Sequence, residues 1–175
     1  MKRLLLPLIL FLIVILEGVA LELLPARLVT GELLIIPHWA FIFLVCVTIF
    51  YDKENTYTSV LYAVIFGLLI DIVYTGILGV YMFIYALVIY IVHGLKKLLH
   101  ANFYVTLLLG FIGIMLSDML IYIIYSVIDI TETTFHHYFI YRFIPTVLAN
   151  LLFLLVLYPL VKKPLEKWRE EQLRT

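Results

Sequence analysis

The sequence predicts an all-α integral membrane protein, and two observations support this prediction. First, 65% of the 175 residues are hydrophobic and only 14% are charged, with a mean hydropathy of +1.15; soluble domains average about half apolar and a quarter charged residues. Second, the apolar residues form long runs, and no segment between them is long enough to fold alone. Lipid must cover this much apolar surface. We therefore expect residues 1–175 to form a single polytopic membrane domain.

Six apolar runs are long enough to be transmembrane helices, because about 20 helical residues cross the hydrocarbon core of a bilayer. The first run follows Lys2 and Arg3 like a signal peptide. It continues past Gly18 without a small-residue cleavage site, so we expect an uncleaved helix. The six helices are predicted over residues 4–21, 33–51, 57–73, 77–95, 103–128 and 139–160, followed by a charged tail over residues 161–175.

The segments at the helix ends have distinct predicted roles. Pro37 is expected in the first turn of the second helix, where its missing amide costs little. Residues 94–102 are expected to form an amphipathic connector in the membrane interface, ahead of the longest helix. Tyrosine is enriched at membrane borders. Four tyrosines at predicted borders are therefore expected to be interfacial anchors: Tyr51, Tyr57, Tyr104 and Tyr138.

The basic residues predict the orientation of the six helices. Cytoplasmic loops of membrane proteins carry an excess of lysine and arginine. With both termini on one side, only Arg27 and Arg142 fall on the opposite side. We therefore expect both termini to be cytoplasmic. Ten basic residues then lie on the cytoplasmic side: Lys2, Arg3, Lys53, Lys96, Lys97, Lys162, Lys163, Lys167, Arg169 and Arg174.

Charge and motif content argue against several classes of function. Twelve basic and twelve acidic residues give no net charge, so nucleic acid is not an expected partner. The single Cys46 has no companion for a disulfide or a metal site. The pair His136 and His137 has no cysteine or carboxylate at ligand spacing, so a solvated loop explains it better than a metal site. No catalytic motif is present. We predict no enzyme, no metal and no cofactor.

The link between the third and fourth helices predicts a tight helical hairpin, because only Tyr74, Thr75 and Gly76 lie between the two runs. Glycines supply the backbone angles of a turn and let helices approach closely. A carboxylate at the end of an apolar helix is costly unless it has a purpose. The candidate structural and partner-binding residues are therefore Gly67, Asp71, Gly76 and Gly79.

A second group of ionisable residues is expected at similar depth in the outer half of the membrane. We predict a polar layer closed by pairing of carboxylates with Arg142. Glu17 and His38 could instead simply reach the interface, and Asp71 and Asp118 could form a structural network or serve transport or proton relay. The candidate members besides Asp71 are Glu17, His38, Asp118 and Arg142.

The hairpin resembles that of the MreD family of the bacterial rod-shape machinery. The resemblance rests on Gly67-Leu68-Leu69, Asp71 and Gly76-Ile77-Leu78-Gly79, followed by an aromatic-rich helix from Tyr81 to Tyr85, and on the length, the start of the chain and the entry Pro37-x-Trp39. It implies a non-enzymatic protein of the bacterial cytoplasmic membrane. It also implies binding to MreC, a bitopic protein, and through it an association with MreB, RodA and an elongation transpeptidase.

The six-helix layout is also similar to the substrate-binding subunits of energy-coupling-factor vitamin transporters. This second likeness implies an alternative function, in which the chain binds a small molecule for transport. Glu17, Asp71, Asp118 and Arg142 would then line an outward-facing cavity. The two hypotheses differ in whether the polar layer is open to a ligand or sealed by internal hydrogen bonds.

Overall fold

The computed structural model describes residues 5–23 and 33–173, and within these ranges the secondary structure is helical, with no strand. The predicted fold class, an all-α multi-pass membrane protein, is confirmed. The elements in chain order are α1 (Leu5–Leu23), α3 (Trp39–Phe50), α4 (Thr58–Ile70), η2 (Asp71–Thr75), α5 (Val80–Leu98), α6 (Phe103–Val127), α7 (Phe135–Tyr138), η3 (Phe139–Phe143) and α8 (Ile144–Leu173), where η2 and η3 are π-helical turns.

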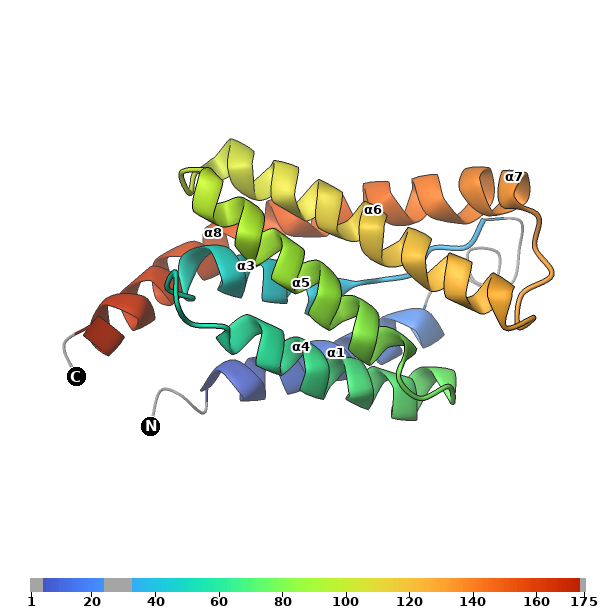
Figure 1. The fold of residues 1–175 in the computed structure, drawn as a ribbon, viewed down its shortest axis with the longest axis horizontal. Helices are drawn as coiled ribbons and strands as arrows, with labels where there is room; N and C mark the ends of the chain where they lie inside the picture. The colour runs from blue at the N-terminus through green and yellow to red at the C-terminus, as the bar shows by residue number, and fades with distance from the viewer. Residues whose placement is uncertain (1–4, 24–32, 174–175) are drawn as a thin grey trace.

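Five helical segments of the described chain are long and apolar enough to cross a membrane, and they surround a shorter sixth helix. The short helix α3 contacts α1, α4, α5, α6 and α8, and Figure 1 shows it in the middle of the bundle. Every residue from Ala40 to Phe50 is buried. The five segments are Leu5–Leu23, Thr58–Thr75, Val80–Leu98, Phe103–Val127 and Phe135–Glu171.

The second helix was predicted over residues 33–51, and this boundary is wrong. The helix begins at Trp39, and residues 33–38 are not helical. Pro37, expected in the first helical turn, lies in this non-helical segment. The segment runs alongside η3 and α8 (Figure 1). The amide of Leu34 donates to the carbonyl of Tyr141, in η3, at 2.8 Å.

Two side chains of α8 satisfy the backbone of this segment. The amide of Ile36 donates to Thr146 Oγ1 at 3.1 Å, and the amide of His38 donates to Asn150 Oδ1 at 2.7 Å. Asn150 Nδ2 in turn donates to the carbonyl of Ile36 at 2.8 Å. Irregular backbone at membrane depth is tolerated only where protein groups replace the missing hydrogen bonds. Thr146 and Asn150 therefore allow the chain to remain non-helical before α3.

Two further boundaries differ from the predictions. The predicted connector over residues 94–102 is helical as far as Leu98, because α5 continues past the apolar run. The last helix begins at Phe135 rather than at residue 139 and contains the π-helical turn η3. It then continues as α8 through the predicted tail to Leu173, despite Pro159 and Pro164. The predicted tail is thus a helical extension of a membrane helix as far as Leu173.

The first and last helices meet the same end of the bundle. Figure 1 shows the start of α1 and the end of α8 at one end, together with the turns from α3 to α4 and from α5 to α6. The turn from α4 to α5 and helix α7 lie at the opposite end. Arg142 in η3 belongs to that opposite end. The other basic residues of the described chain belong to the end that contains the start of α1: Lys53, Lys96, Lys97, Lys162, Lys163, Lys167 and Arg169.

Candidate functional site

The carboxylate of Asp71 caps the first turn of the following helix. Its Oδ2 accepts hydrogen bonds from the amides of Gly79 at 2.9 Å and Met82 at 3.1 Å, and its Oδ1 accepts one from the amide of Tyr81 at 2.9 Å. The N-cap residue of α5 is Gly79, which has no side chain to satisfy these donors. Asp71 supplies the missing acceptors from η2 and places a negative charge at the positive end of α5.

Glycines make the hairpin around Asp71 possible. Gly76 and Gly79 have φ angles of 68° and 99°, in the left-handed region that favours glycine. Gly67 lies where α4 meets the start of α5, and a Cβ atom there would be 2.7 Å from Met82 Cα and 2.8 Å from the carbonyl oxygen of Tyr81. The two helix backbones are therefore in direct contact at Gly67. Gly67 thus sets the contact between α4 and α5, while Asp71, Gly76 and Gly79 form the link between them.

A second buried carboxylate, that of Asp118 on α6, gathers side chains from three other elements. Tyr138 of α7 donates its hydroxyl to Oδ2 at 2.7 Å. The Oδ1 atom lies 3.5 Å from His38 Nε2 and 3.4 Å from Arg142 Nη2. Tyr138 thus makes the short hydrogen bond, while His38 and Arg142 approach at the long limit for such contacts. Asp118 and His38 are fully buried.

His38 connects this cluster to α5. Its Nδ1 lies 2.8 Å from the hydroxyl of Tyr85, so a neutral ring that donates from Nε2 to Asp118 accepts at Nδ1 from Tyr85. The rings of Tyr81 and Tyr85 are 5.4 Å apart, and the amide of Tyr81 is bound by Asp71. The cap at the start of α5 therefore positions the two tyrosines that face His38.

Glu17 satisfies a different helix end. Its Oε2 accepts a hydrogen bond from the amide of Ala40, in the first turn of α3, at 3.3 Å. The side chain is buried within the bundle. This oxygen satisfies one of the amides that a helix leaves unpaired in its first turn. Glu17 of α1 therefore does for α3 what Asp71 does for α5.

Of the predicted polar layer, the structure brings His38, Asp118 and Arg142 together in one hydrogen-bonded cluster. Glu17 accepts a hydrogen bond from the backbone amide of Ala40, two residues after His38, rather than pairing with Arg142. Asp71 is bound by backbone amides. The layer is thus two helix caps and one side-chain cluster, and its functional role stays a prediction.

The comparisons with known proteins agree with the resemblance carried by the hairpin. The family model described as rod shape-determining protein MreD matches residues 2–168. A curated relative, the rod shape-determining protein MreD of Bacillus subtilis (strain 168), is 32% identical over 157 residues, which cover 90% of this chain and 90% of the relative. The chain belongs to the MreD family.

Membership of the MreD family confirms the resemblance predicted from the sequence. The protein is a multi-pass protein of the bacterial cytoplasmic membrane with a role in cell shape. No solved structure matches the chain.

Several residues of this MreD site were missed or misassigned by sequence reasoning. Tyr138 was predicted to be an interfacial anchor, and this is wrong, because its side chain is only 1% exposed and donates to Asp118. Thr146 and Asn150 were not singled out. Their spacing of four on an apolar helix places both on one face, which is a usable signal for a shared partner. Tyr85 could not be distinguished among 13 tyrosines.

We predict a moderate loss of stability when the negative charge of Asp118 is removed. In Asp118→Asn, the side chain keeps only one acceptor oxygen for the three groups that contact Asp118, those of His38, Tyr138 and Arg142. We therefore expect the free energy of unfolding to fall by about 1–3 kcal/mol. Thermal and denaturant unfolding in detergent would measure the change. Asp129→Asn, in an exposed turn, is the matched control. Equal stability of the two variants would contradict a structural role for the cluster.

Proposed function

We propose that this MreD protein is a non-enzymatic membrane component of the elongation complex, which binds MreC and through it is associated with MreB, RodA and an elongation transpeptidase. The family match over residues 2–168 supports this proposal. The observation that carries it is the internal use of the buried ionisable groups. Asp71 and Asp118 are fully buried, and both carboxylate oxygens of each accept hydrogen bonds from protein groups.

A scaffold protein can use its buried carboxylates for internal contacts alone. A ligand site or a catalytic centre needs polar groups that remain available to a substrate. Here the carboxylates instead hold helix ends and neighbouring helices in place. The excess of basic residues at the end with the start of α1 also supports an orientation with both termini in the cytoplasm.

The membrane-facing surface offers a place for a partner helix along the seam between α1 and α8. Two apolar hollows, of about 580 and 410 Å³, lie on this seam, and α3 forms their floor with Trp39 and Phe43. We propose that the single transmembrane helix of MreC lies along this seam. In lipid, helices associate through close packing, which hollows of this kind permit. The walls include Ile9, Ile13 and Ala20 of α1 and Ala149, Val156 and Leu160 of α8.

Co-purification tests the proposed partner. Tagged protein would be extracted from its native membrane in mild detergent, and retained proteins would be identified by mass spectrometry. Recovery of MreC in a stable ratio, with wall-synthesis enzymes, is the expected result. Recovery of a transport ATPase or of a stoichiometric metabolite in place of MreC would overturn the proposal in favour of a transport subunit.

A bulky side chain in the seam should weaken MreC binding. Val156 is 57% exposed and lines the hollow of about 580 Å³, whereas Leu155 is 46% exposed and lines neither hollow. Adjacent residues on a helix point about 100° apart. We expect Val156→Trp to reduce recovered MreC about fivefold or more, as overpacking costs 1 kcal/mol or more. Leu155→Trp should leave recovery unchanged, and equal recovery with both variants would exclude the seam.

A further inference from the structure

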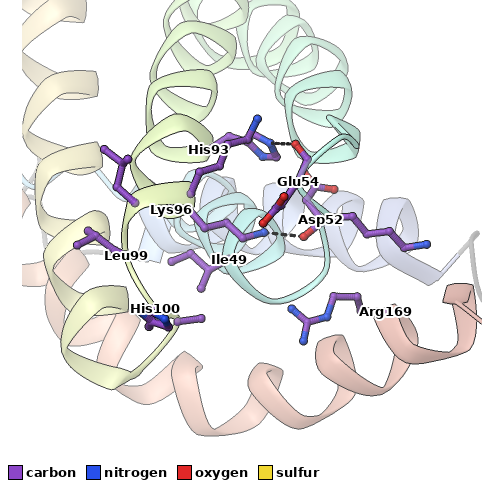
Figure 2. A pocket seen from close by; sticks show the side chains of 12 residues that line it. Ile49, Asp52, Glu54, His93, Lys96, Leu99, His100 and Arg169 are labelled. Atoms are coloured by element: carbon purple, nitrogen blue, oxygen red, sulfur yellow. Dashed lines mark hydrogen bonds between the residues drawn. The ribbon is translucent and has the colours of Figure 1, made fainter.

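A cavity of about 470 Å³ lies at the end of the bundle that contains the start of α1 and the end of α8. It is formed by the turn from α3 to α4, the last turn of α5, the link to α6 and the extension of α8. Figure 2 shows Arg169 reaching toward this space from α8, opposite Lys96 and Asp52. We call it the basic cavity. Its polar lining includes Asp52, His93, Lys96, Lys97, His100 and Arg169.

Positive charge dominates the basic cavity. Its lining contains four lysines and arginines but only two carboxylates, those of Asp52 and Glu54. The ammonium group of Lys96 donates to the carbonyls of Thr48 and Asp52, at 2.7 and 2.5 Å, so it closes the end of α3. Its charge is attracted by the nearby carboxylate of Asp52. Cationic side chains therefore outnumber carboxylates in the lining.

Two of these cations are available to a ligand. Arg169 forms neither a hydrogen bond nor an ion pair with the part of the chain that the structure describes. Lys97 is exposed, and its ammonium group lies 5.5 Å from the ring centroid of Tyr57. Guanidinium and ammonium groups are the usual protein ligands of phosphate. Both belong to elements that the bundle fixes, α8 and α5.

The wall of the basic cavity also contains polar atoms that the protein does not use. Nδ1 of His93 and Oδ1 of Asp52 are buried without a hydrogen-bond partner among the described residues. The other atoms of both side chains are engaged: His93 Nε2 lies 3.2 Å from the carbonyl of Glu54, and Asp52 Oδ2 accepts from Ser59.

The position of the basic cavity distinguishes a lipid from a free anion. Lys96 and Lys97 come directly after the apolar run of α5, where a membrane helix meets the headgroups. Leu98, which is 80% exposed, and Leu99 also line the cavity and provide an apolar flank next to the cations. A ligand that fits both features has a phosphate beside hydrocarbon. We propose that the basic cavity binds the headgroup of an anionic phospholipid, with Arg169 and Lys97 contacting its phosphate.

Lipid binding to the purified full-length protein tests this assignment. Native mass spectrometry and thermal unfolding in detergent would compare added phosphatidylglycerol, phosphatidylcholine and inorganic phosphate. One basic residue near an anionic headgroup changes binding about fivefold. We expect retention of phosphatidylglycerol over phosphatidylcholine, reduced about fivefold in Arg169→Gln. Lys167→Gln is the matched control, because Lys167 lies two residues away on α8, is exposed and does not line the cavity.

Each outcome decides between the lipid and another source of the effect. Lys97→Gln changes a different helix and should reproduce the loss, so a folding defect of one variant does not mimic the result. Equal retention of both lipids by the unmodified protein would overturn the proposal. Equal loss in Arg169→Gln and Lys167→Gln would show general surface charge instead of a site. Thermal stabilisation by inorganic phosphate equal to that by phosphatidylglycerol would replace the lipid by a free anion.

Discussion

Asp71→Ala is expected to lower the free energy of unfolding by about 3–5 kcal/mol, since it leaves three amides at the start of α5 without their acceptors in a buried site. In lipid no water replaces these hydrogen bonds. The loss should also disorder the approach of Tyr85 to His38, because the cap sets the position of α5. Unfolding by detergent titration and by heat would measure the change, and the protein should fail to restore rod shape in cells depleted of their own MreD.

Two further variants make this prediction specific. Asp71→Asn keeps one acceptor oxygen in the same place, so its loss of stability should be smaller than that of Asp71→Ala. Glu132→Ala removes an exposed carboxylate at the same end of the bundle and should be neutral. The structural role of Asp71 fails if Asp71→Ala unfolds like Glu132→Ala. If it unfolds early but still retains MreC and supports rod shape, the hairpin is not needed for partner binding.

The membrane class and the helices were predictable because each depends on local composition. Apolar runs separated by Tyr74-Thr75-Gly76 or by a polar turn are visible in the chain itself. The non-helical segment over residues 33–38 was not predictable in this way, since its sequence is as apolar as a helix. Its conformation depends on Thr146 and Asn150, more than 100 residues later in the chain. Pro37 acts in the same direction, because proline disfavours helical backbone at the residue before it.

In the candidate site, too, the sequence allowed the need for partners to be inferred but not which partners they are. The chemistry of Asp71 and its glycines could be inferred, because a carboxylate between two apolar helices needs partners wherever the helices lie. Which partners it has could not be inferred: both Arg142 and backbone amides were compatible with the sequence, and the structure shows the amides. Likewise, Tyr138 at a membrane border is compatible with anchoring or with burial, and only the path of α7 over α6 brings its hydroxyl to Asp118.

A common principle explains both helix caps. The first turn of every helix leaves amides without an intrahelical partner. The chain supplies carboxylates for them from other helices, Glu17 for α3 and Asp71 for α5. Acidic residues that look like candidates for transport in the sequence are thus used to start helices at defined depths. This use explains why the protein contains carboxylates in its membrane core.

Gly67→Ala should be the most damaging substitution that adds a single methyl group. The added Cβ would lie 2.7 Å from Met82 Cα and 2.8 Å from the carbonyl oxygen of Tyr81, so the backbone of α5 would have to move. That shift would also lengthen the hydrogen bonds from Met82 and Tyr81 to Asp71. We expect a loss of about 2–4 kcal/mol, at or above the upper range for overpacking, because backbone cannot change rotamer.

Gly94→Ala provides the matched control on the neighbouring helix. Gly94 is a helical residue of α5 with open space around its Cβ position. Alanine is favoured over glycine in a helix by about 1 kcal/mol, so Gly94→Ala should be neutral or slightly stabilising. Thermal unfolding of both variants in the same detergent measures the difference. If Gly67→Ala is as stable as Gly94→Ala, α4 and α5 are not in backbone contact, and the hairpin must be held by Asp71 without the close approach that Gly67 permits.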